Sequence, residues 1–296
     1  MTAMDRNETH PPAPDVRVDA YLGTVVHVVG SRQARPNLPS EGCPFCPGGI
    51  ESPEAYDVRW FSNRWPAMPG ARCEVVLYSP DHNATFWSQG VDGIRKVIDL
   101  WTQRSTELNA RDDVEFVLVF ENRGGEVGAT ISHPHGQIYA YDHVPDRPRR
   151  VFSAGWQPDT EPGRRRVAFC GEWQAYVPDA PTYPIAITLA PRSRVANLAG
   201  LTEQGCDDLA ALLVDVFARL DALYDQPLPY MMWLMQSPSG GGAWSDAWFH
   251  IEIVSPWRSA GVPRFIAAAE VACGEFFNPM IPEVLAEHLR DVHQSS

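Results

Sequence analysis

The sequence predicts an α+β fold in two halves, each built from antiparallel strands and a flanking helix. Segments rich in β-branched and aromatic residues are separated by two long segments whose apolar residues recur at helical spacing. The order of strands, helix and further strands occurs twice along the chain, which indicates an internal duplication. This order favours antiparallel sheets over a strictly alternating βαβ chain.

The first half is expected to span residues 16–141. Strands are predicted at residues 21–29, 74–78 and 114–120, and a last strand at 137–141. Between the second and third of these, a helix is predicted within residues 91–111, where the apolar residues at helical spacing are Ile94, Val97, Ile98, Trp101 and Leu108. Residues 1–15 are polar and rich in proline, and we expect them to form a disordered tail.

The second half is expected to span residues 167–296, after a stretch rich in proline and arginine at 142–166 that we interpret as a linker. Strands are predicted at residues 173–177, 184–189, 230–235 and 248–254. An amphipathic helix is predicted over residues 209–223. A final helix is predicted over 282–292, with Pro282 at the first helical position, where proline fits well.

The charge of the chain restricts its partners. It carries 24 Lys and Arg against 37 Asp and Glu, a formal net charge of −13, which would repel a nucleic-acid backbone. A small phosphorylated substrate is compatible, because a few cationic groups inside a cleft can bind it. The sequence has no apolar segment of a secretory signal and no run near the roughly 18 apolar residues of a membrane span. We therefore expect a cytoplasmic protein with neither nucleic acid nor a membrane as a partner.

One segment concentrates residues that can perform chemistry. Gly124, Gly125 and Gly128 follow a predicted strand and form a loop whose backbone N–H groups can approach phosphate oxygens. His133, His135 and Gln137 then alternate with other residues, so in an extended chain their side chains project from the same face. An imidazole in this position can attack phosphorus and form a labile N–P bond, which divides one displacement into two. Gln137 can donate hydrogen bonds to the phosphoryl oxygens.

Two cysteines predict a metal site close to these histidines. Cys43 and Cys46 have C-x-x-C spacing in a turn bounded by prolines, whereas six cysteines in 296 residues are too few for a disulfide framework. A redox pair is the alternative, but the motif does not open a helix after a strand. The best completing ligands are His82 and His133, which gives a tetrahedral zinc site with four protein ligands. A closed set of this kind is structural.

The chain resembles the galactose-1-phosphate uridylyltransferase family of the histidine-triad superfamily from about residue 16 onward. The matching features are distributed over both halves: Arg32-Gln33-Ala34-Arg35-Pro36, the Cys43 and Cys46 pair, Phe61-Ser62-Asn63, Ser79-Pro80-Asp81-His82, Phe120-Glu121-Asn122, His133-Pro134-His135-Gly136-Gln137 and Arg258-Ser259-Ala260. The resemblance implies two histidine-triad-like halves. It also implies transfer of UMP from UDP-glucose to a hexose 1-phosphate, with galactose 1-phosphate as the expected acceptor.

The resemblance also implies roles for individual residues. His135 matches the nucleophile that becomes uridylylated in a ping-pong cycle, and Gln137 matches the residue that binds the phosphoryl group. The family's zinc ligands match Cys43, Cys46, His82 and His133. The substrate-binding positions match Arg32, Arg35, Asn63, Asn122, Gly128, Thr130, Arg264, Phe265 and Glu270. Because the family's site lies at a subunit interface, a homodimer is implied.

The sequence departs from the family pattern at two other places. Some members hold a second metal in the C-terminal half, but here the corresponding pair is His250 and Glu252, with Gln236 and Val151 near the other two ligand positions. We expect this second site to be empty or altered. At the sugar end, Phe276 replaces a glutamine that contacts the hexose in some members, and in the glycine loop a carboxylate, Glu126, stands where small apolar residues are common.

Three functions are compatible with these features. The first is a UDP-glucose:hexose-1-phosphate uridylyltransferase. The second keeps the nucleotidyl-histidine chemistry on another base or sugar phosphate, as in adenylyl-transferring or phosphorolytic relatives. The third is a zinc-stabilised scaffold that binds nucleotides without turnover, which the combination of His133, His135 and Gln137 argues against.

Overall fold

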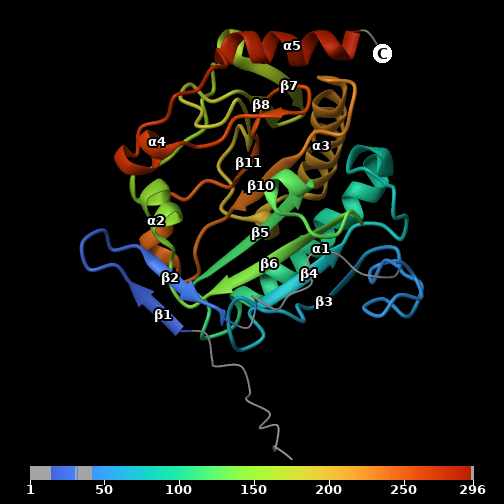
Figure 1. Cartoon of the computed structure of the whole chain (residues 1–296), viewed down its shortest axis with the longest axis vertical. Helices are drawn as coiled ribbons and strands as arrows, with labels where there is room; N and C mark the ends of the chain where they lie inside the picture. The colour runs from blue at the N-terminus through green and yellow to red at the C-terminus, as the bar shows by residue number, and fades with distance from the viewer. Residues whose placement is uncertain (1–14, 31, 33–41, 295–296) are drawn as a thin grey trace, which may run out of the picture.

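A nine-stranded antiparallel sheet runs through the computed structural model of this chain, which describes residues 15–30, 32 and 42–294 (Figure 1). The strand order is β3-β4-β6-β5-β10-β11-β9-β8-β7. The strands are β3 (Arg59–Ser62), β4 (Cys73–Leu77), β5 (Phe116–Arg123), β6 (His135–Tyr141), β7 (Arg166–Cys170), β8 (Trp173–Tyr176), β9 (Ile185–Pro191), β10 (Tyr230–Met235) and β11 (His250–Ser255).

The internal duplication is visible in this strand order. The sequence β3-β4-β6-β5 on one side is mirrored by β8-β9-β11-β10 on the other, and β7 is added at the edge. The two sets meet where β5 pairs with β10, and Phe120 lies opposite Trp233 at this junction. The predicted halves are therefore present, but they share one continuous sheet.

Helices α1 (Gly90–Asn109) and α3 (Glu203–Ala222) pack against each other and against the sheet. Their apolar residues join Ile138 and Ala140 of β6 in one core cluster. Because side chains alternate along a strand, His135 and Gln137 of β6 lie on the opposite, less covered face. The helix packing thus decides which face of β6 presents its functional groups.

Both long helices form where the apolar spacing predicts them, and α5 (Pro282–Gln294) begins at the predicted proline. The predicted strand at 21–29 was too long: β2 (Val25–Val28) pairs with β1 (Asp15–Val18) in a separate hairpin. The Asp19 carboxylate accepts hydrogen bonds from the N–H groups of Tyr21 and Leu22 at 2.8 and 2.7 Å, which turns the chain there.

Several elements were not predicted. The presumed linker 142–166 contains α2 (Asp146–Ser153), a short helix that buries only Pro148 and Phe152 and so carries little periodicity. The C-terminal half also contains β12 (Trp257–Ser259), β13 (Val262–Pro263) and α4 (Ala268–Cys273). Of the predicted tail, residues 1–14 lie outside the described residues, and Asp15 already belongs to β1. None of the helices in the described ranges has the length and apolar character needed to cross a membrane.

Candidate functional site

His135 is the first residue of β6, and its ring is held in one orientation. Its Nδ1 donates a hydrogen bond to the carbonyl oxygen of His133 at 2.7 Å. Since a carbonyl can only accept, Nδ1 carries a proton, and in the neutral ring the lone pair is then on Nε2. The ring of Phe45 lies edge-on to the His135 ring, with centroids 5.0 Å apart. His135 therefore holds its ring in one orientation on the less covered face of the sheet.

Gln137 lies two residues further along the same face and contacts a second predicted site residue. The Asn63 side-chain amide donates to Gln137 Oε1 at 3.3 Å, and Asn63 Oδ1 accepts from the backbone N–H of Trp65 at 2.8 Å. With its oxygen oriented toward Asn63, Gln137 retains its amide hydrogens for another acceptor. The fold thus brings together two residues that are 74 positions apart.

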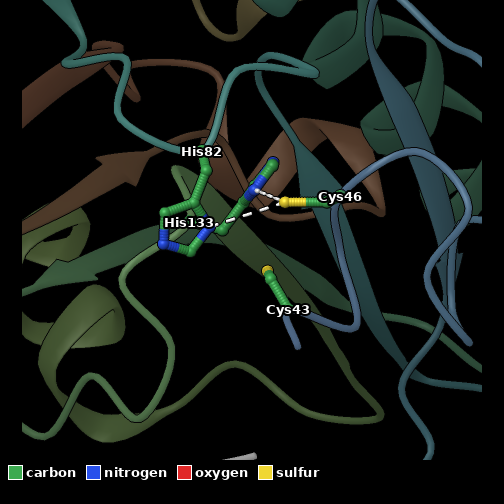
Figure 2. A group of neighbouring side chains, drawn as sticks. All are labelled: Cys43, Cys46, His82 and His133. Atoms are coloured by element: carbon green, nitrogen blue, oxygen red, sulfur yellow. Dashed lines mark hydrogen bonds between the residues drawn. The ribbon is translucent and has the colours of Figure 1, made fainter. Parts of the chain in front are cut away.

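The four predicted metal ligands converge beside this strand (Figure 2). The ligand atoms of Cys43, Cys46, His82 and His133 all lie within 4.8 Å of one another. Cys46 Sγ is 3.6 Å from Nδ1 of His82 and 3.6 Å from Nδ1 of His133. Two such atoms bound to one tetrahedral zinc would be separated by about 3.5 Å, given Zn–S and Zn–N bonds of about 2.3 and 2.0 Å. The geometry of the cluster therefore fits a tetrahedral ion.

Contacts around the cluster aim both imidazoles at the same point. Nε2 of His133 donates to the carbonyl oxygen of Ser79 at 2.8 Å, and Nε2 of His82 is 3.2 Å from the Ser132 hydroxyl. These contacts leave the Nδ1 atoms directed at the cysteines, as supporting contacts do around metal-binding histidines. Burial lowers the pKa of His133, which favours the neutral ring, and burial raises the pKa of the Cys46 thiol.

Two aromatic side chains complete this region and were not predicted. Phe45 stands between the two cysteines, and its ring contacts both His133 and His135. Tyr56 donates to the carbonyl oxygens of Phe45 and Ser79 at 2.7 and 3.0 Å, and its hydroxyl is also 2.9 Å from His133 Nε2. The position of Phe45 inside the C-x-x-C motif was a usable signal, whereas no local pattern marks Tyr56.

The glycine loop after β5 uses several of its own N–H groups. The backbone N–H groups of Val127 and Ala129 both donate to the carbonyl of Gly124, and that of Gly128 donates to Gly125. These three donors are therefore engaged within the loop and do not point to an outside acceptor. Gly124 has φ 97°, and a Cβ there would lie 2.7 Å from Pro229, so only glycine fits. Thr130 lies between this loop and His133.

A buried carboxyl group lies behind the histidine strand, on the helix-covered face. Glu121 follows Phe120, which pairs with Gln137, and its Oε1 accepts a hydrogen bond from the Tyr230 hydroxyl at 2.7 Å. Within the described residues, Glu121 Oε2 and the hydroxyl of buried Tyr78 have no hydrogen-bond partner. Burial raises the pKa of Glu121 to about 8 despite the Tyr230 hydrogen bond. This carboxyl is therefore mostly protonated near neutral pH.

Gly136, between His135 and Gln137, is the residue of β6 that lies against the hydroxyl of buried Tyr78. An added Cβ at Gly136 would lie 1.9 Å from the Tyr78 hydroxyl and 3.0 Å from the carbonyl oxygen of Phe120. The hydroxyl of Tyr78 thus occupies the space of the missing side chain. This explains in physical terms why glycine separates the two functional residues.

The second half repeats the histidine arrangement with different partners. His250 begins β11 as His135 begins β6, and its Nδ1 donates to the carbonyl of Trp248 at 2.9 Å. Trp156 stacks on the His250 ring with centroids 3.7 Å apart. Arg147 donates to both oxygens of Glu252, at 2.9 and 2.7 Å. Burial opposes ionisation of Glu252, but His250 and Arg147 outweigh it and lower its pKa to about 2.

The other two residues at the second-site positions supply no metal ligand, because Gln236 is engaged elsewhere and Val151 is apolar. Gln236 is buried, donating to Ser105 Oγ at 3.2 Å and accepting from Leu198 N–H at 3.1 Å. Val151 lies on α2 and lines a cavity of about 600 Å³ together with His250 and Glu252. Asn122, a predicted substrate residue, lines the same cavity. Across the described residues, no third His, Cys, Asp or Glu joins His250 and Glu252 in a metal-type cluster.

The predicted sugar-end residues contact one another and not the His135 region. Arg264 pairs with Glu270 and donates to the carbonyls of Phe277 and Thr182 at 3.0 and 3.1 Å. Phe265, by contrast, is 79% exposed. Arg32 donates its backbone N–H to Val29 just after β2, and Arg35 lies outside the described residues. Among the described residues, a hydrogen bond links His135 to His133 of the Cys/His cluster, and another links Gln137 to Asn63.

Comparisons with family models identify a related group of proteins. The model described as galactose-1-phosphate uridyl transferase, N-terminal domain, matches residues 62–145. The model for the C-terminal domain of the same proteins matches residues 133–296. A galactose-1-phosphate uridylyltransferase from Thermotoga maritima is 33% identical, with 94% of this chain and 98% of the relative covered. One from Streptomyces lividans is 34% identical, covering 94% and 87%.

Solved structures agree in fold. A uridylyltransferase structure superposes with a TM-score of 0.86 at 26% identity, covering 95% of this chain and 98% of the other. An ADP-glucose phosphorylase from Arabidopsis thaliana, solved with bound ADP-glucose, has a TM-score of 0.73 at 21% identity, covering 94% and 99%. The second likeness extends to the fold alone.

Proposed function

We propose, on the premise that this chain belongs to the galactose-1-phosphate uridyl transferase family, that it moves UMP from UDP-glucose to a hexose 1-phosphate through a covalent intermediate on His135. The expected acceptor is galactose 1-phosphate, the substrate in the names of the relatives. The observation that carries the proposal is the fixed ring of His135, whose Nδ1 is committed to the His133 carbonyl and whose Nε2 is left as the nucleophile.

The reaction then proceeds in two displacements at the same phosphorus atom. In the first, the Nε2 lone pair of His135 forms a bond to the α-phosphorus of UDP-glucose, and the bond from this phosphorus to the bridging oxygen breaks. The electron pair leaves with glucose 1-phosphate. In the second, a phosphate oxygen of the acceptor attacks the uridylylated histidine, and the N–P bond electrons return to Nε2. In each step one bond to phosphorus forms as another breaks: an anhydride P–O bond is exchanged for an N–P bond in the first step, and the reverse exchange occurs in the second.

Gln137 supports these steps through its side-chain amide. Its oxygen is held by Asn63 at 3.3 Å, so the amide hydrogens can donate to non-bridging phosphoryl oxygens where negative charge accumulates. Asn63 acts as a positioning residue for Gln137. The hydrogen bonds inside the glycine loop hold its backbone in one shape, and Thr130, which follows the loop, is the candidate phosphate contact there.

A Zn²⁺ ion held by Cys43, Cys46, His82 and His133 would complete the site. The donor set of two thiolates and two imidazoles suits zinc, and four protein ligands leave no open coordination position for substrate. When bound, the ion supplies a cross-link and no reaction step. It would join the loop carrying Phe45 to the start of β6, and so hold the carbonyl that orients His135.

A homodimer would complete the substrate end of the site. Arg264 and Glu270 are committed to each other, but exposed apolar side chains surround them: Phe265, Val271, Phe277 and Ile281 are each at least 60% exposed. The β1–β2 hairpin also exposes Tyr21 and Leu22, at 97% and 79%. Apolar surfaces of this kind are typical of protein interfaces. We assign both surfaces to contact with a second copy of this chain.

The proposal is tested by the intact mass of the purified protein after incubation with UDP-glucose without acceptor. We expect an added UMP, which galactose 1-phosphate removes, and no adduct in His135→Ala. His250→Ala is the matched control, because His250 has the same position and hydrogen bond in the second half and should still leave an adduct on His135. A persistent adduct in His135→Ala would refute the mechanism, and an AMP adduct from ADP-glucose in place of UMP would redirect the nucleotide assignment.

A further inference from the structure

A second cavity lies on the far side of the molecule from His135, between β7, α3 and α5 (top of Figure 1). It has a volume of about 550 Å³. β7 is the edge strand of the sheet, and the strand order places it six positions from β6. The cavity is therefore separate from the site that contains the histidine strand.

The lining of this cavity is cationic in an otherwise acidic protein. Its charged lining residues are Arg164, Arg166, Arg219 and Arg290 against a single carboxylate, Asp215. The whole chain has a net charge of −13. Four guanidinium groups around one cavity of such a chain are a local reversal of charge, which attracts anions despite the overall field.

These arginines are only partly neutralised. Arg219 is 8% exposed and pairs with Asp215 at 2.9 Å. Arg166 has only a distant partner, Glu161 at 3.9 Å, whose side chain is 89% exposed. Among the described residues, neither Arg164 nor Arg290 has a carboxylate within ion-pair distance. The cavity therefore retains a surplus of positive charge.

Backbone contacts hold two of the guanidinium groups at the cavity wall. Arg219 donates from Nη1 to the carbonyl oxygen of Leu289 on α5 at 3.0 Å. Arg290 donates from Nη1 to the carbonyl oxygens of Arg164, at 3.0 Å, and Arg166. Carbonyl groups fix a guanidinium without cancelling its charge, so the remaining N–H groups are pre-positioned for a charged acceptor.

We propose that this arginine cavity binds a phosphate-bearing small molecule. Planar guanidinium groups match phosphate oxygens with paired hydrogen bonds, which a cavity with several arginines can supply from different sides. Phe169, which is 74% exposed on β7, lines the same cavity and offers a ring face to the uncharged part of the ligand. The ligand class is thus a phosphomonoester attached to a sugar or nucleoside.

An occupant of the cavity would bridge α5 to β7 and act on the end of α3. Arg219 lies in the last turn of α3, and two residues later Asp221 accepts from Arg123 at 2.7 and 3.2 Å. Arg123 ends β5, directly before the glycine loop. The last turn of α3 is therefore shared by the cavity wall, through Arg219, and by the base of that loop, through Asp221, so an occupant that moves this turn is placed to modulate the site that contains His135.

The test is isothermal titration with three probes: inorganic phosphate, glucose 1-phosphate and UMP. For the phosphate ester that fits, we expect binding that weakens about tenfold or more in Arg164→Ala/Arg166→Ala, since charge-assisted contacts are lost. Arg192→Ala, an exposed arginine on the loop after β9, is the control and should bind as the unmodified protein does. Arg164→Lys/Arg166→Lys keeps the charge and should recover part of the affinity.

Hydrogen exchange provides the second measurement. Ligand should slow amide exchange in α5 and at residues 124–128 of the unmodified protein and of Arg192→Ala, but not of Arg164→Ala/Arg166→Ala. Slowing confined to α5 would support the site and refute its link to the loop. Equal affinity of the Arg164→Ala/Arg166→Ala variant and the control for all three probes would overturn the proposal.

Discussion

The carbonyl oxygen of His133 lies 2.7 Å from Nδ1 of His135, so a residue of the Cys/His cluster and the proposed nucleophile are joined by one hydrogen bond. The side chain of His133 contributes to the four-residue cluster, while its backbone orients the ring of His135. Only one residue, Pro134, separates them. Any disturbance of the cluster is therefore transmitted directly to the reactive imidazole.

Loss of a metal ligand should lower both metal content and reactivity. In Cys43→Ala we expect zinc to fall and the rate of UMP-adduct formation to drop about 10- to 100-fold, because the His133 carbonyl is no longer held. His135→Ala should lose the adduct and keep the metal. Elemental analysis with mass spectrometry measures both. Cys273→Ala, which removes an exposed cysteine, is the control, and an unchanged adduct rate in metal-free Cys43→Ala would contradict the coupling.

The contact between Asn63 and Gln137 should appear as an energetic coupling in kcat/KM. Gln137→Ala removes a donor to the phosphoryl group, so we expect a loss of about 10²- to 10³-fold. Asn63→Ala frees the Gln137 amide to rotate and should cost about 2- to 10-fold, the value of one neutral hydrogen bond. In the double variant the Asn63 effect should vanish, since its partner is gone. Strict additivity would show that Asn63 acts independently.

Gly136→Ala should destabilise the protein through the hydroxyl of Tyr78. The added Cβ would lie 1.9 Å from that oxygen, and overpacking of this kind typically costs about 1–3 kcal/mol. Tyr78→Phe removes the shortest of these contacts without breaking a hydrogen bond, because the hydroxyl has no partner among the described residues, and it leaves the ring Cζ 2.8 Å from the added Cβ. Urea denaturation should therefore show a smaller cost of Gly136→Ala in the Tyr78→Phe background. The same cost in both backgrounds would place the strain elsewhere.

Glu121 should make the free energy of unfolding depend on pH. Its pKa is raised from 4.5 to about 8 by burial, so between these values the folded state binds a proton that the unfolded state has released. Stability is therefore greatest below about pH 4.5, falls as the pH rises toward 8 and then levels off. Over this range the loss should be on the order of a few kcal/mol.

Glu121→Gln isolates this contribution. The amide is neutral at every pH and can still accept the Tyr230 hydrogen bond. Between pH 5 and 8 the unmodified protein should therefore lose stability relative to the variant. Denaturant titrations at three pH values measure the unfolding free energies of the two proteins. Arg123, which also faces the carboxyl, is present in both proteins. A pH-independent difference would show that Glu121 ionises normally in the folded protein.

Local sequence patterns were sufficient for some of the elements and insufficient for others. Helices α1 and α3 each bury a long apolar stripe, and their periodicity identifies them without any tertiary information. α2 could not be found in this way, because its eight residues bury only Pro148 and Phe152 and the helix depends on packing against the sheet. The turn at Asp19 shortened a predicted strand through a side-chain contact that hydrophobic patterning does not record.

Some residues of the site could likewise be predicted from local sequence patterns, and others could not. The alternation of His133, His135 and Gln137, and the C-x-x-C spacing, are short-range features that predict one face and one metal cluster, and the structure places the four ligands together. Phe45 could have been inferred from its place between the cysteines. Tyr56 and Glu121 could not, since each becomes significant only through residues far away in the chain.

The sequence by itself therefore determined the two-part α+β class, the histidine strand and the metal-ligand set, because these depend on periodicity and on spacings within a few residues. Only the tertiary structure decided that the halves share one sheet, that Arg147 pairs with Glu252 and Trp156 stacks on His250, and that Arg264 is committed to Glu270. These features depend on contacts between residues that are far apart in the chain. Burial and charge pairing determine which of those contacts form, and no local sequence pattern records them.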